Sequence, residues 1–372
     1  MVRTHALLNL AYKAFRPGLF ALDPERAHEW TFTFLRLVEA LLCRLRVPVS
    51  PAAYPALEQN VAGLRFPNPI GLAAGLDKNA EVPHVWALLG FGFAELGTLT
   101  AQAQPGNPEP RLWRFPAERA LVNRMGFNNR GAEAVARELA GKLDMLRSPI
   151  PLGINIGKSR STPLDRAADD YAASFARLAP LADYICVNVS SPNTPNLRDL
   201  QTPRQLGQIL DRLHEENQRL LDGNHMSHPC PIFVKVAPDL SLDDVAALVE
   251  VLEAKNVAAL VATNTTTARS PQQAATMPEG GLSGAPLRER ATEIIRAFFR
   301  RLRGRVPIVG VGGVFSAEDA YEKVQAGASL VQLYTGLIYE GPAIVPTICE
   351  GLIALLERDG VKHIGDVIGA RV

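Results

Sequence analysis

Several residues that could do chemistry stand directly after short apolar runs. Ser190 and Ser191 follow the run 184–189 and open the segment SSPNTPNLRDLQ. No histidine lies within twenty residues of Ser191. The pattern therefore does not indicate a nucleophilic serine activated by an adjacent base. If Ser191 takes part in a reaction, it does so in a role other than that of a nucleophile. The strands and helices around it determine which side chains lie next to it.

Two lysines occupy similar positions. Lys78 ends the segment AGLDKN, and Lys235 lies inside the apolar segment FVKVAP. A lysine in such a setting needs an anionic partner, and Glu95 is the obvious candidate within the apolar runs. A strand-end lysine could form a Schiff base with a carbonyl substrate or favour the reduced form of a flavin. The lysines alone do not separate these two chemistries.

Eight short apolar runs alternate with helix-like segments and must position these residues. Runs rich in Val, Ile and Leu are typical of strands buried on both faces of a parallel sheet. Eight strand–helix units predict an α/β fold of the (β/α)8 TIM barrel type. A doubly wound open sheet is the alternative, but no GxGxxG opens the helix after the first strand. The predicted strands are 69–75, 91–98, 151–157, 182–191, 231–238, 257–265, 307–313 and 328–335.

A barrel of this kind carries its chemistry at the carboxyl ends of its strands. Many amide side chains fall there, which indicates a planar ligand dense in donors and acceptors, such as a pyrimidine ring. Glycines after the last two strands and in the segment GGLSG (280–284), expected to be flexible, indicate a phosphate-bearing ligand. The residues at these strand ends include no histidine and no cluster of carboxylates, so we expect no metal site there. The amides are Asn123, Asn155, Asn188, Asn193 and Asn264.

The first fifty residues differ from the rest. The segment ALLNLAYKAFRPGLF predicts a helix broken at Pro17-Gly18, and Asp23 with Pro24 predicts the start of a second helix. Both have an apolar face and basic residues, as in helices that lie on a bilayer, although packing on their own domain fits equally well. Proline-rich VPVSPAAYP predicts a linker. We therefore divide the chain into a helical region 1–46, a linker 47–59 and a barrel 60–372.

Bulk properties exclude several classes. The net charge of +1 gives no reason to expect nucleic acid as a partner. The four cysteines form no CxxC pair, so neither a zinc site nor a redox dithiol is expected. No apolar run is long enough to predict a membrane span, and no signal peptide of the usual form is present.

Nine motifs in register carry a family resemblance. AGLDKN, NRMGFNN, GINIGK, VNVSSPNTPNLRDLQ, VKVAPDL, ATNTT, GGLSGAPL, GVGG and ASLVQLYTG occur in this order. Together they resemble dihydroorotate dehydrogenase, specifically the quinone-dependent, membrane-associated class 2. The segment LDPERAHEW is similar to the amino-terminal extension of that class. The resemblance implies oxidation of (S)-dihydroorotate to orotate in pyrimidine (UMP) biosynthesis, with FMN as hydride acceptor and a ubiquinone-type quinone as final acceptor.

The resemblance also implies site residues. Those at FMN positions are Ala74, Gly75, Lys78, Thr98, Asn155, Asn188, Lys235, Thr263, Gly284, Gly313, Tyr334 and Thr335. Those at dihydroorotate positions are Lys78, Asn123, Arg124, Met125, Gly126, Phe127, Asn188, Asn193, Asn264 and Thr265. Quinone contacts fall on His28, Arg114 and Tyr334.

The catalytic base position falls on Ser191. Serine is a weak base at neutral pH, so it needs a relay, which we expect Thr194 to supply with water. The resemblance further implies a monomeric peripheral membrane protein, bound through its amino-terminal helices to the cytoplasmic side of a bacterial inner membrane.

Rival functions remain open at this point. A phosphate-binding aldolase or lyase barrel would use Lys78 or Lys235 as a Schiff base. A soluble flavin reductase of another ene-type substrate would use the amino-terminal helices as a dimer contact. A binding module without catalysis fits the dense polar strand ends poorly.

Overall fold

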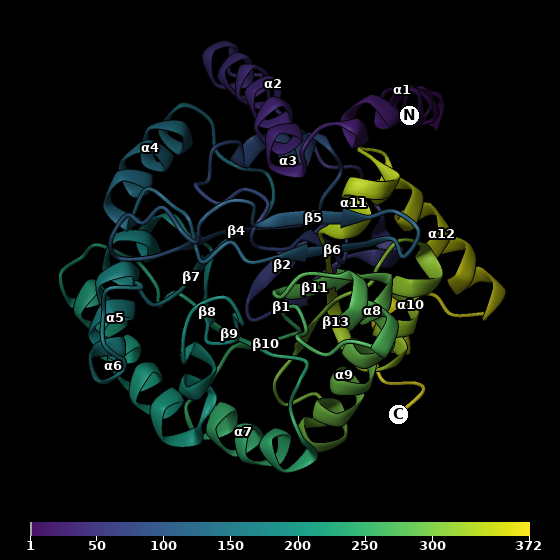
Figure 1. Ribbon diagram of the computed structural model, residues 1–372. Helices are drawn as coiled ribbons and strands as arrows, with labels where there is room; N and C mark the ends of the chain where they lie inside the picture. Colours follow the sequence, from purple (N-terminus) through teal and green to yellow (C-terminus); the bar gives the residue numbers. More distant parts are fainter. Residues whose placement is uncertain (1) are drawn as a thin grey trace.

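The protein, described by a computed structural model over residues 2–372 with side chains described from Asn9 onward, is built around a closed parallel barrel (Figure 1). Its strands follow one another around the barrel in chain order, and the last pairs with the first. The closed barrel agrees with the predicted TIM barrel and excludes the open sheet. The strands are β3 (Ile70–Leu72), β4 (Phe93–Leu99), β7 (Leu152–Ile156), β8 (Tyr184–Asn188), β9 (Ile232–Val236), β10 (Ala259–Ala262), β12 (Ile308–Val311) and β13 (Ala328–Leu333).

Helices surround the barrel on its outer face (Figure 1). Local sequence sets several of their starts: Ser241 and Asp244 form a capping box at α7, and Ser316 caps α10. The α-helices are α3 (Pro83–Leu88), α4 (Ala132–Met145), α5 (Ala167–Leu178), α6 (Pro203–Asp222), α7 (Leu242–Ala254), α8 (Pro271–Thr276), α9 (Arg288–Leu302), α10 (Ala317–Gln325), α11 (Thr335–Glu340) and α12 (Ile344–Arg358). The 3-10 helices are η1 (Pro55–Leu57), η2 (Leu164–Arg166), η3 (Ala179–Leu181), η4 (Leu197–Gln201), η5 (Ala285–Leu287) and η6 (Ile364–Val367).

Aromatic rings fill the barrel interior opposite glycines. A Cβ at Gly71 would lie 2.2 Å from the ring of Phe93, and one at Gly153 would lie 2.0 Å from the ring of Tyr184. Tyr184 in turn stacks on Phe233 at 4.2 Å between ring centroids. The alternation of small and large residues packs the interior as a solid core and leaves only the barrel mouth for a ligand.

A short hairpin closes the amino-terminal end of the barrel. It consists of β1 (Gln59–Val61) and β2 (Leu64–Phe66), and Phe66 packs edge-on against Phe93 at 5.2 Å. Gln59, the last residue of the predicted linker, is therefore already part of this hairpin.

The long excursion after the second barrel strand forms a separate antiparallel sheet. It contains β5 (Leu112–Phe115), β6 (Ala120–Asn123) and, from far along the chain, β11 (Gly281–Gly284). The expectation that GGLSG is a flexible loop was therefore wrong, because pairing with β6 makes it a strand. This sheet places Asn123 and Ser283 beside the barrel mouth.

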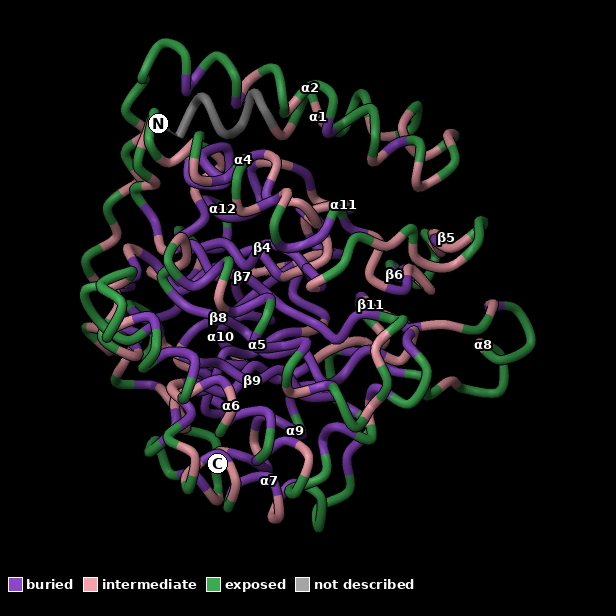
Figure 2. Tube along the Cα trace, turned by 90° about the vertical axis from the view of Figure 1, so that its left-hand side faces the viewer, coloured by how far each residue is buried: buried purple, intermediate pink, exposed green. Residues whose placement is uncertain are grey.

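The two amino-terminal helices lie against one side of the barrel (Figures 1 and 2). They are α1 (Val2–Ala21) and α2 (Pro24–Leu45), and Asp23 caps α2 as predicted. The predicted break at Pro17 was wrong, because α1 continues through it to Ala21. Contacts outside the helix hold this last turn: Arg16 donates to the carbonyl oxygen of Tyr339 at 2.8 Å, and Arg114 donates to that of Leu19 at 3.1 Å.

Large apolar side chains remain exposed on these helices. Figure 2 shows much of α2 and of the described part of α1 as exposed, in contrast to the buried barrel strands. Among the described residues, no helix is both long enough and apolar enough to cross a membrane. The exposed apolar residues of this surface are Leu10, Phe15, Trp30, Phe34, Leu37, Leu41, Leu45 and Val47.

Candidate active site

One cavity opens at the carboxyl ends of the barrel strands, beneath the β5–β6–β11 sheet. Its walls combine strand ends, the loop 123–129 and glycine-rich turns. Most of the residues predicted from the sequence come together here, which follows from the shared orientation of parallel strands. The predicted residues that line it are Ala74, Gly75, Lys78, Thr98, Asn123, Met125, Gly126, Phe127, Asn188, Ser191, Asn193, Lys235, Thr263, Asn264, Thr265, Gly284, Gly313, Tyr334 and Thr335.

Five predicted residues lie outside this lining. Asn155 lies beneath it, where its side-chain oxygen accepts hydrogen bonds from Thr98 at 2.6 Å and Asn188 at 3.0 Å. The side chain of Arg124 turns away, donates to the carbonyl oxygen of Pro110 at 3.1 Å and lies over the ring of Trp113. The role of Arg124 in substrate binding stays a prediction. The other three are Thr194, His28 and Arg114.

The amide side chains form two hydrogen-bonded groups across the mouth, Asn193 with Asn123, and Asn264 with Asn188 and Asn155. Asn193 Nδ2 donates to Asn123 Oδ1 at 3.0 Å, which joins the loop after β8 to the inserted sheet. Asn264 Nδ2 donates to Ser190 Oγ at 3.0 Å, which joins the loop after β10 to that after β8. Because each amide is held by another, their free donors and acceptors have fixed directions toward the cavity.

Ser191 lies in the cavity wall with its hydroxyl held by the backbone. Its Oγ accepts a hydrogen bond from the N–H of Asn193 at 3.2 Å. Thr194 is buried, and its hydroxyl has no hydrogen-bond partner among the described residues. The ring of Phe127 packs close over Gly157, where a Cβ would lie 2.8 Å away. Ser191 itself is buried, and one unpaired hydroxyl, that of Thr194, stands three residues further on.

Two lysines supply positive charge, Lys78 half-buried and Lys235 buried. Burial lowers the pKa of Lys78 to about 8, although nearby Glu25 acts in the opposite direction. Glu25, from the start of α2, forms a two-oxygen ion pair with Arg111 at 2.8 Å. Lys235 projects from β9 and pairs with Glu95 at the cavity floor. The two ammonium groups thus reach the cavity from two different strand ends, and Glu95 offsets the charge of one of them.

Glycines on one side of the cavity stand where the neighbouring protein atoms leave no space for a side chain. Gly313 has φ +71°, and a Cβ there would lie 2.5 Å from Cβ of Arg288. A Cβ at Gly336 would lie 2.1 Å from the carbonyl oxygen of Val314. Beside them the hydroxyls of Ser283 and Thr335 lie 2.9 Å apart. Backbone N–H groups and hydroxyls of this kind suit a phosphate, so this side fits a phosphorylated cofactor.

The three predicted quinone contacts lie between the barrel and the amino-terminal helices. Tyr334 lines the cavity, whereas His28 stacks on Phe32 with 4.4 Å between ring centroids. Burial, with Lys78 and Arg36 nearby, lowers the pKa of His28 to about 3, so the imidazole is neutral at pH 7. The guanidinium of Arg114 is engaged by carbonyl groups at the end of α1 and lies over the ring of Phe20 at 4.7 Å.

Sequence reasoning missed several residues of the site. Gln332 lines the cavity floor and donates to Glu95 at 2.9 Å; a polar residue inside the apolar run ASLVQLYT was a usable signal. Ser283 could have been found in the same way within GGLSG. Glu25 and Arg111 stand 86 residues apart, and no local pattern links them. Leu112 and Leu121 were missed as well, whereas Gly312 and Gly336, which also line the cavity, belong to the glycines expected after the last two strands.

Comparisons with known proteins agree on one family. The family model described as dihydroorotate dehydrogenase matches residues 56–356. A dihydroorotate dehydrogenase (quinone) from Gloeobacter violaceus is 52% identical over 359 residues, which cover 96% of this chain and 98% of that protein. A dihydroorotate dehydrogenase (quinone) from Myxococcus xanthus is 51% identical, and the match covers 96% of this chain and 97% of that protein. A crystal structure of DHODH from Eimeria tenella in complex with ferulenol matches with a TM-score of 0.85 and 34% sequence identity. The match covers 96% of this chain and 98% of that chain.

Proposed function

This chain belongs to the dihydroorotate dehydrogenase family, and we propose on that premise how its residues perform the reaction. The protein oxidises dihydroorotate to orotate in pyrimidine biosynthesis and passes the electrons to a quinone. One observation carries the assignment of residues: Ser191, three asparagine amides and Lys78 face a single cavity. A planar cyclic imide with a carboxylate matches those groups one by one.

The amides position the substrate ring. Asn123, Asn193 and Asn264 offer donors and acceptors in fixed directions, as the imide edge of dihydroorotate requires. Lys78 supplies a positive charge for the substrate carboxylate. Held in this way, the ring presents its C5 proton to the reacting side chain without a search through orientations.

Ser191 removes the proton from C5. Its hydroxyl is already oriented by the N–H of Asn193, which supports the developing charge on oxygen. A serine cannot keep that proton at neutral pH, so Thr194 passes it on through water. The unpaired, buried hydroxyl of Thr194 supports this relay.

The glycine-rich side of the cavity would hold FMN, and Gly284, Gly313 and Thr335 would bind its phosphate. Lys235, Thr98 and Asn188 line the cavity and would contact the flavin ring, and Asn155 holds Thr98 and Asn188 from below. Bound FMN supplies the acceptor for the hydride leaving C6 and a carrier of electrons to the quinone. Lys235 stabilises negative charge on the reduced cofactor.

The amino-terminal helices bring the quinone to the site. Their exposed apolar side chains form a surface suited to the interface of a bilayer. Between them and the barrel, His28 and Tyr334 line the approach, and Arg114 holds the end of α1 in place. The protein acts as a monomer bound peripherally to the cytoplasmic side of a bacterial inner membrane.

The spectrum of the purified full-length protein tests this function. The protein should be yellow, and anaerobic dihydroorotate should bleach it until a quinone restores the colour. The alternative, a Schiff-base aldolase or lyase using Lys78 or Lys235, is not favoured by the family membership. A colourless protein that borohydride traps covalently on a carbonyl substrate would overturn the proposal.

A further inference from the structure

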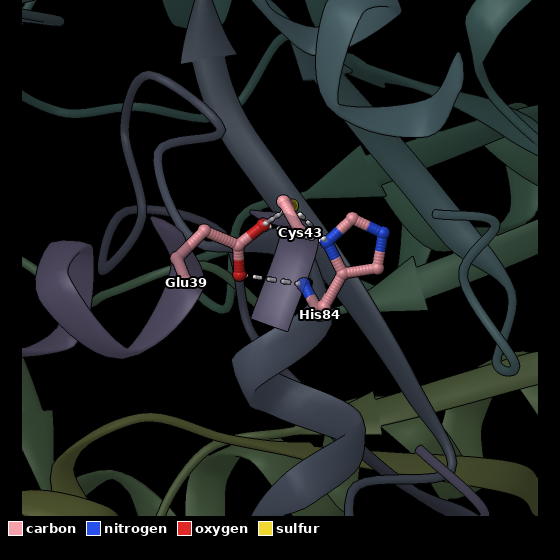
Figure 3. Close-up of side chains that lie close together, drawn as sticks. All are labelled: Glu39, Cys43 and His84. Atoms are coloured by element: carbon pink, nitrogen blue, oxygen red, sulfur yellow. Dashed lines mark hydrogen bonds and ion pairs between the residues drawn. The ribbon is translucent and has the colours of Figure 1, made fainter. Parts of the chain in front are cut away.

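A second cluster of reactive side chains lies outside the cavity, where α2 packs on α3 (Figure 3). Glu39 and Cys43 stand one turn apart on α2 and face His84 of α3. All three are buried, and none lines the barrel mouth. Glu39 and Cys43 do line a groove that reaches the surface beside α4.

The three ligand atoms have separations close to those of a metal site. Cys43 Sγ lies 3.6 Å from Glu39 Oε1 and 3.7 Å from His84 Nδ1. A tetrahedral zinc ion with Zn–S of about 2.3 Å and Zn–N or Zn–O of about 2.0 Å places sulfur roughly 3.5 Å from either atom. His84 Nδ1 and Glu39 Oε1 lie 2.6 Å apart and hydrogen-bond. They would separate by about 0.7 Å in a tetrahedral site, which a small rotation of side chains allows.

We propose that Glu39, Cys43 and His84 form a structural site for a zinc-like divalent cation that ties the amino-terminal helices to the barrel. A water from the groove completes four ligands. The carboxylate and a thiolate together balance the charge of the ion, so the buried site stays neutral.

Groups outside the triad already orient two of the ligands. His84 Nε2 lies 2.6 Å from the carbonyl oxygen of Leu146, so it carries a ring proton, and Nδ1 binds the ion once the proton in its hydrogen bond to Glu39 is displaced. Glu39 Oε2 accepts the backbone N–H of His84 at 3.2 Å, which leaves Oε1 directed at the cluster. Such contacts to a backbone carbonyl and from a backbone N–H are typical supports of metal ligands.

Two features disfavour binding of a cation, the protonated thiol of Cys43 and the nearby charge of Lys142, and neighbouring groups offset each of them. Burial raises the pKa of Cys43 to about 11, so the ion must displace the thiol proton, as coordination to cysteine does. Lys142 lies nearby, but its ammonium donates to the carbonyl oxygens of Ala80 at 3.2 Å and Glu81 at 2.7 Å and is held away from the triad.

The consequence is mechanical. Glu39 and Cys43 belong to the helix that carries the exposed apolar surface, whereas His84 follows the first barrel strand. A bound ion would fix the position of α2 on the barrel and, through it, the approach between the helices and the cavity. This inference does not depend on the proposed reaction, because none of the three residues has a role in it.

Zinc binding by the full-length flavoprotein tests the site. Equilibrium dialysis of metal-free protein against Zn²⁺ should give one tightly bound equivalent, and Co²⁺ in its place should give a thiolate-to-cobalt absorption band. At Zn²⁺ concentrations about 100 times Kd, the Tm should rise by roughly 3 °C or more. The matched variants are Cys43→Ala and Cys349→Ala, since both remove a buried free thiol.

Cys43→Ala should lose the cobalt band, the bound equivalent and the Tm shift, while Cys349→Ala keeps all three. Both variants should still be bleached by dihydroorotate, which shows that they are folded. His84→Gln should weaken zinc binding at least tenfold. If wild-type protein binds no zinc equivalent, or if Cys43→Ala binds it equally well, the cluster is a hydrogen-bonded triad only and the proposal is wrong.

Discussion

The ammonium group of Lys235 lies 3.6 Å from the carboxylate of Glu95, and both side chains are buried at the floor of the cavity. Glu95 also accepts hydrogen bonds from Asn155 at 2.8 Å and Gln332 at 2.9 Å. A carboxylate beneath the site therefore offsets the charge of the lysine that faces the ligand. Removing the charge of Glu95 should therefore change the reduction potential of the bound flavin.

We expect Glu95→Gln to raise the two-electron reduction potential of the bound flavin. The uncompensated charge of Lys235 would favour the reduced, anionic form by about 1–2 kcal/mol, on the order of 20–45 mV. Redox titration with indicator dyes measures the shift. Glu216→Gln is the control, because Glu216 is also a buried carboxylate with a cationic partner but lies on α6. An unchanged or lower potential in Glu95→Gln would contradict the pairing.

Ser191→Ala should slow the reduction of flavin by dihydroorotate by about 10²-fold or more, because no other group takes the C5 proton. Anaerobic stopped-flow absorbance measures the rate, and orotate affinity should change only a few-fold. Ser174→Ala is the control, since Ser174 is a buried serine of α5 outside the cavity. Full-rate reduction in Ser191→Ala would sink the assignment of the base.

The relay makes a separate prediction for Thr194. Thr194→Val keeps the side-chain shape but removes the hydroxyl, and it should slow flavin reduction on the order of tenfold while Thr194→Ser restores it. The affinity for orotate should stay unchanged, because the hydroxyl does not line the cavity. Equal rates for the valine and serine variants would remove Thr194 from the pathway.

The depressed pKa of Lys78 predicts a pH dependence. Lys78 carries its charge below about pH 8 and loses it above, so kcat/KM for the anionic substrate should fall about tenfold per unit above pH 8. Lys78→Arg should abolish that limb of the profile, since arginine does not titrate there. Burial also lowers the pKa of Lys323, outside the cavity lining, to about 8, so Lys323→Met separates the two groups. If Lys323→Met loses the fall in kcat/KM above pH 8 and Lys78→Arg keeps it, the titrating group is Lys323 and the prediction for Lys78 is wrong.

Gly313→Ala should weaken FMN binding at least tenfold. An alanine there has both a positive φ and a Cβ 2.5 Å from Arg288 Cβ, so the loop beside the phosphate must move. Gly63→Ala is the control, because Gly63 has φ +78° but open space around it. Both variants should lose stability, and only Gly313→Ala should lose flavin, as measured by FMN content and fluorescence titration. Equal flavin content in the two would contradict the phosphate site.

The apolar surface of α2 should bind lipid. Phe34→Glu combined with Leu37→Glu should abolish co-sedimentation with anionic phospholipid vesicles and lower turnover with a long-chain quinone. Flavin reduction by dihydroorotate should not change. Leu242→Glu, on α7, alters a leucine that is 63% exposed, close to the 68% of Leu37, and should have no effect. Unchanged vesicle binding in the double variant would refute the membrane role of this surface.

Much of the architecture could be predicted from local patterns. The eight apolar runs became the eight barrel strands in order, because burial on both faces leaves a signal that each segment carries alone. The cap of α2 was predictable because it too is local: the side chain of Asp23 accepts hydrogen bonds from backbone N–H groups two and three residues further along the chain. Parallel strands then placed Asn188, Lys235 and Thr263 at one mouth.

Other features had no local signal. The helix expected to break at Pro17 continued, since Arg16 and Arg114 hold its last turn through residues far along the chain. The segment 280–284 became a strand only because β6 offered it a partner. The side chain of Arg124 left the cavity because Pro110 and Trp113 bind it.

The sequence by itself determined the order of the elements, the end of the barrel that carries the chemistry and the residues that gather there, since these follow from periodicity and capping within short segments. The sequence also singled out Glu95 as the partner of Lys235, and the two pair in the structure. Only the tertiary structure decided the other meetings: Glu25 with Arg111, and Glu39 and Cys43 with His84. Such pairs join residues tens of positions apart, and their energies depend on burial and distance. Neither quantity exists until the chain has folded.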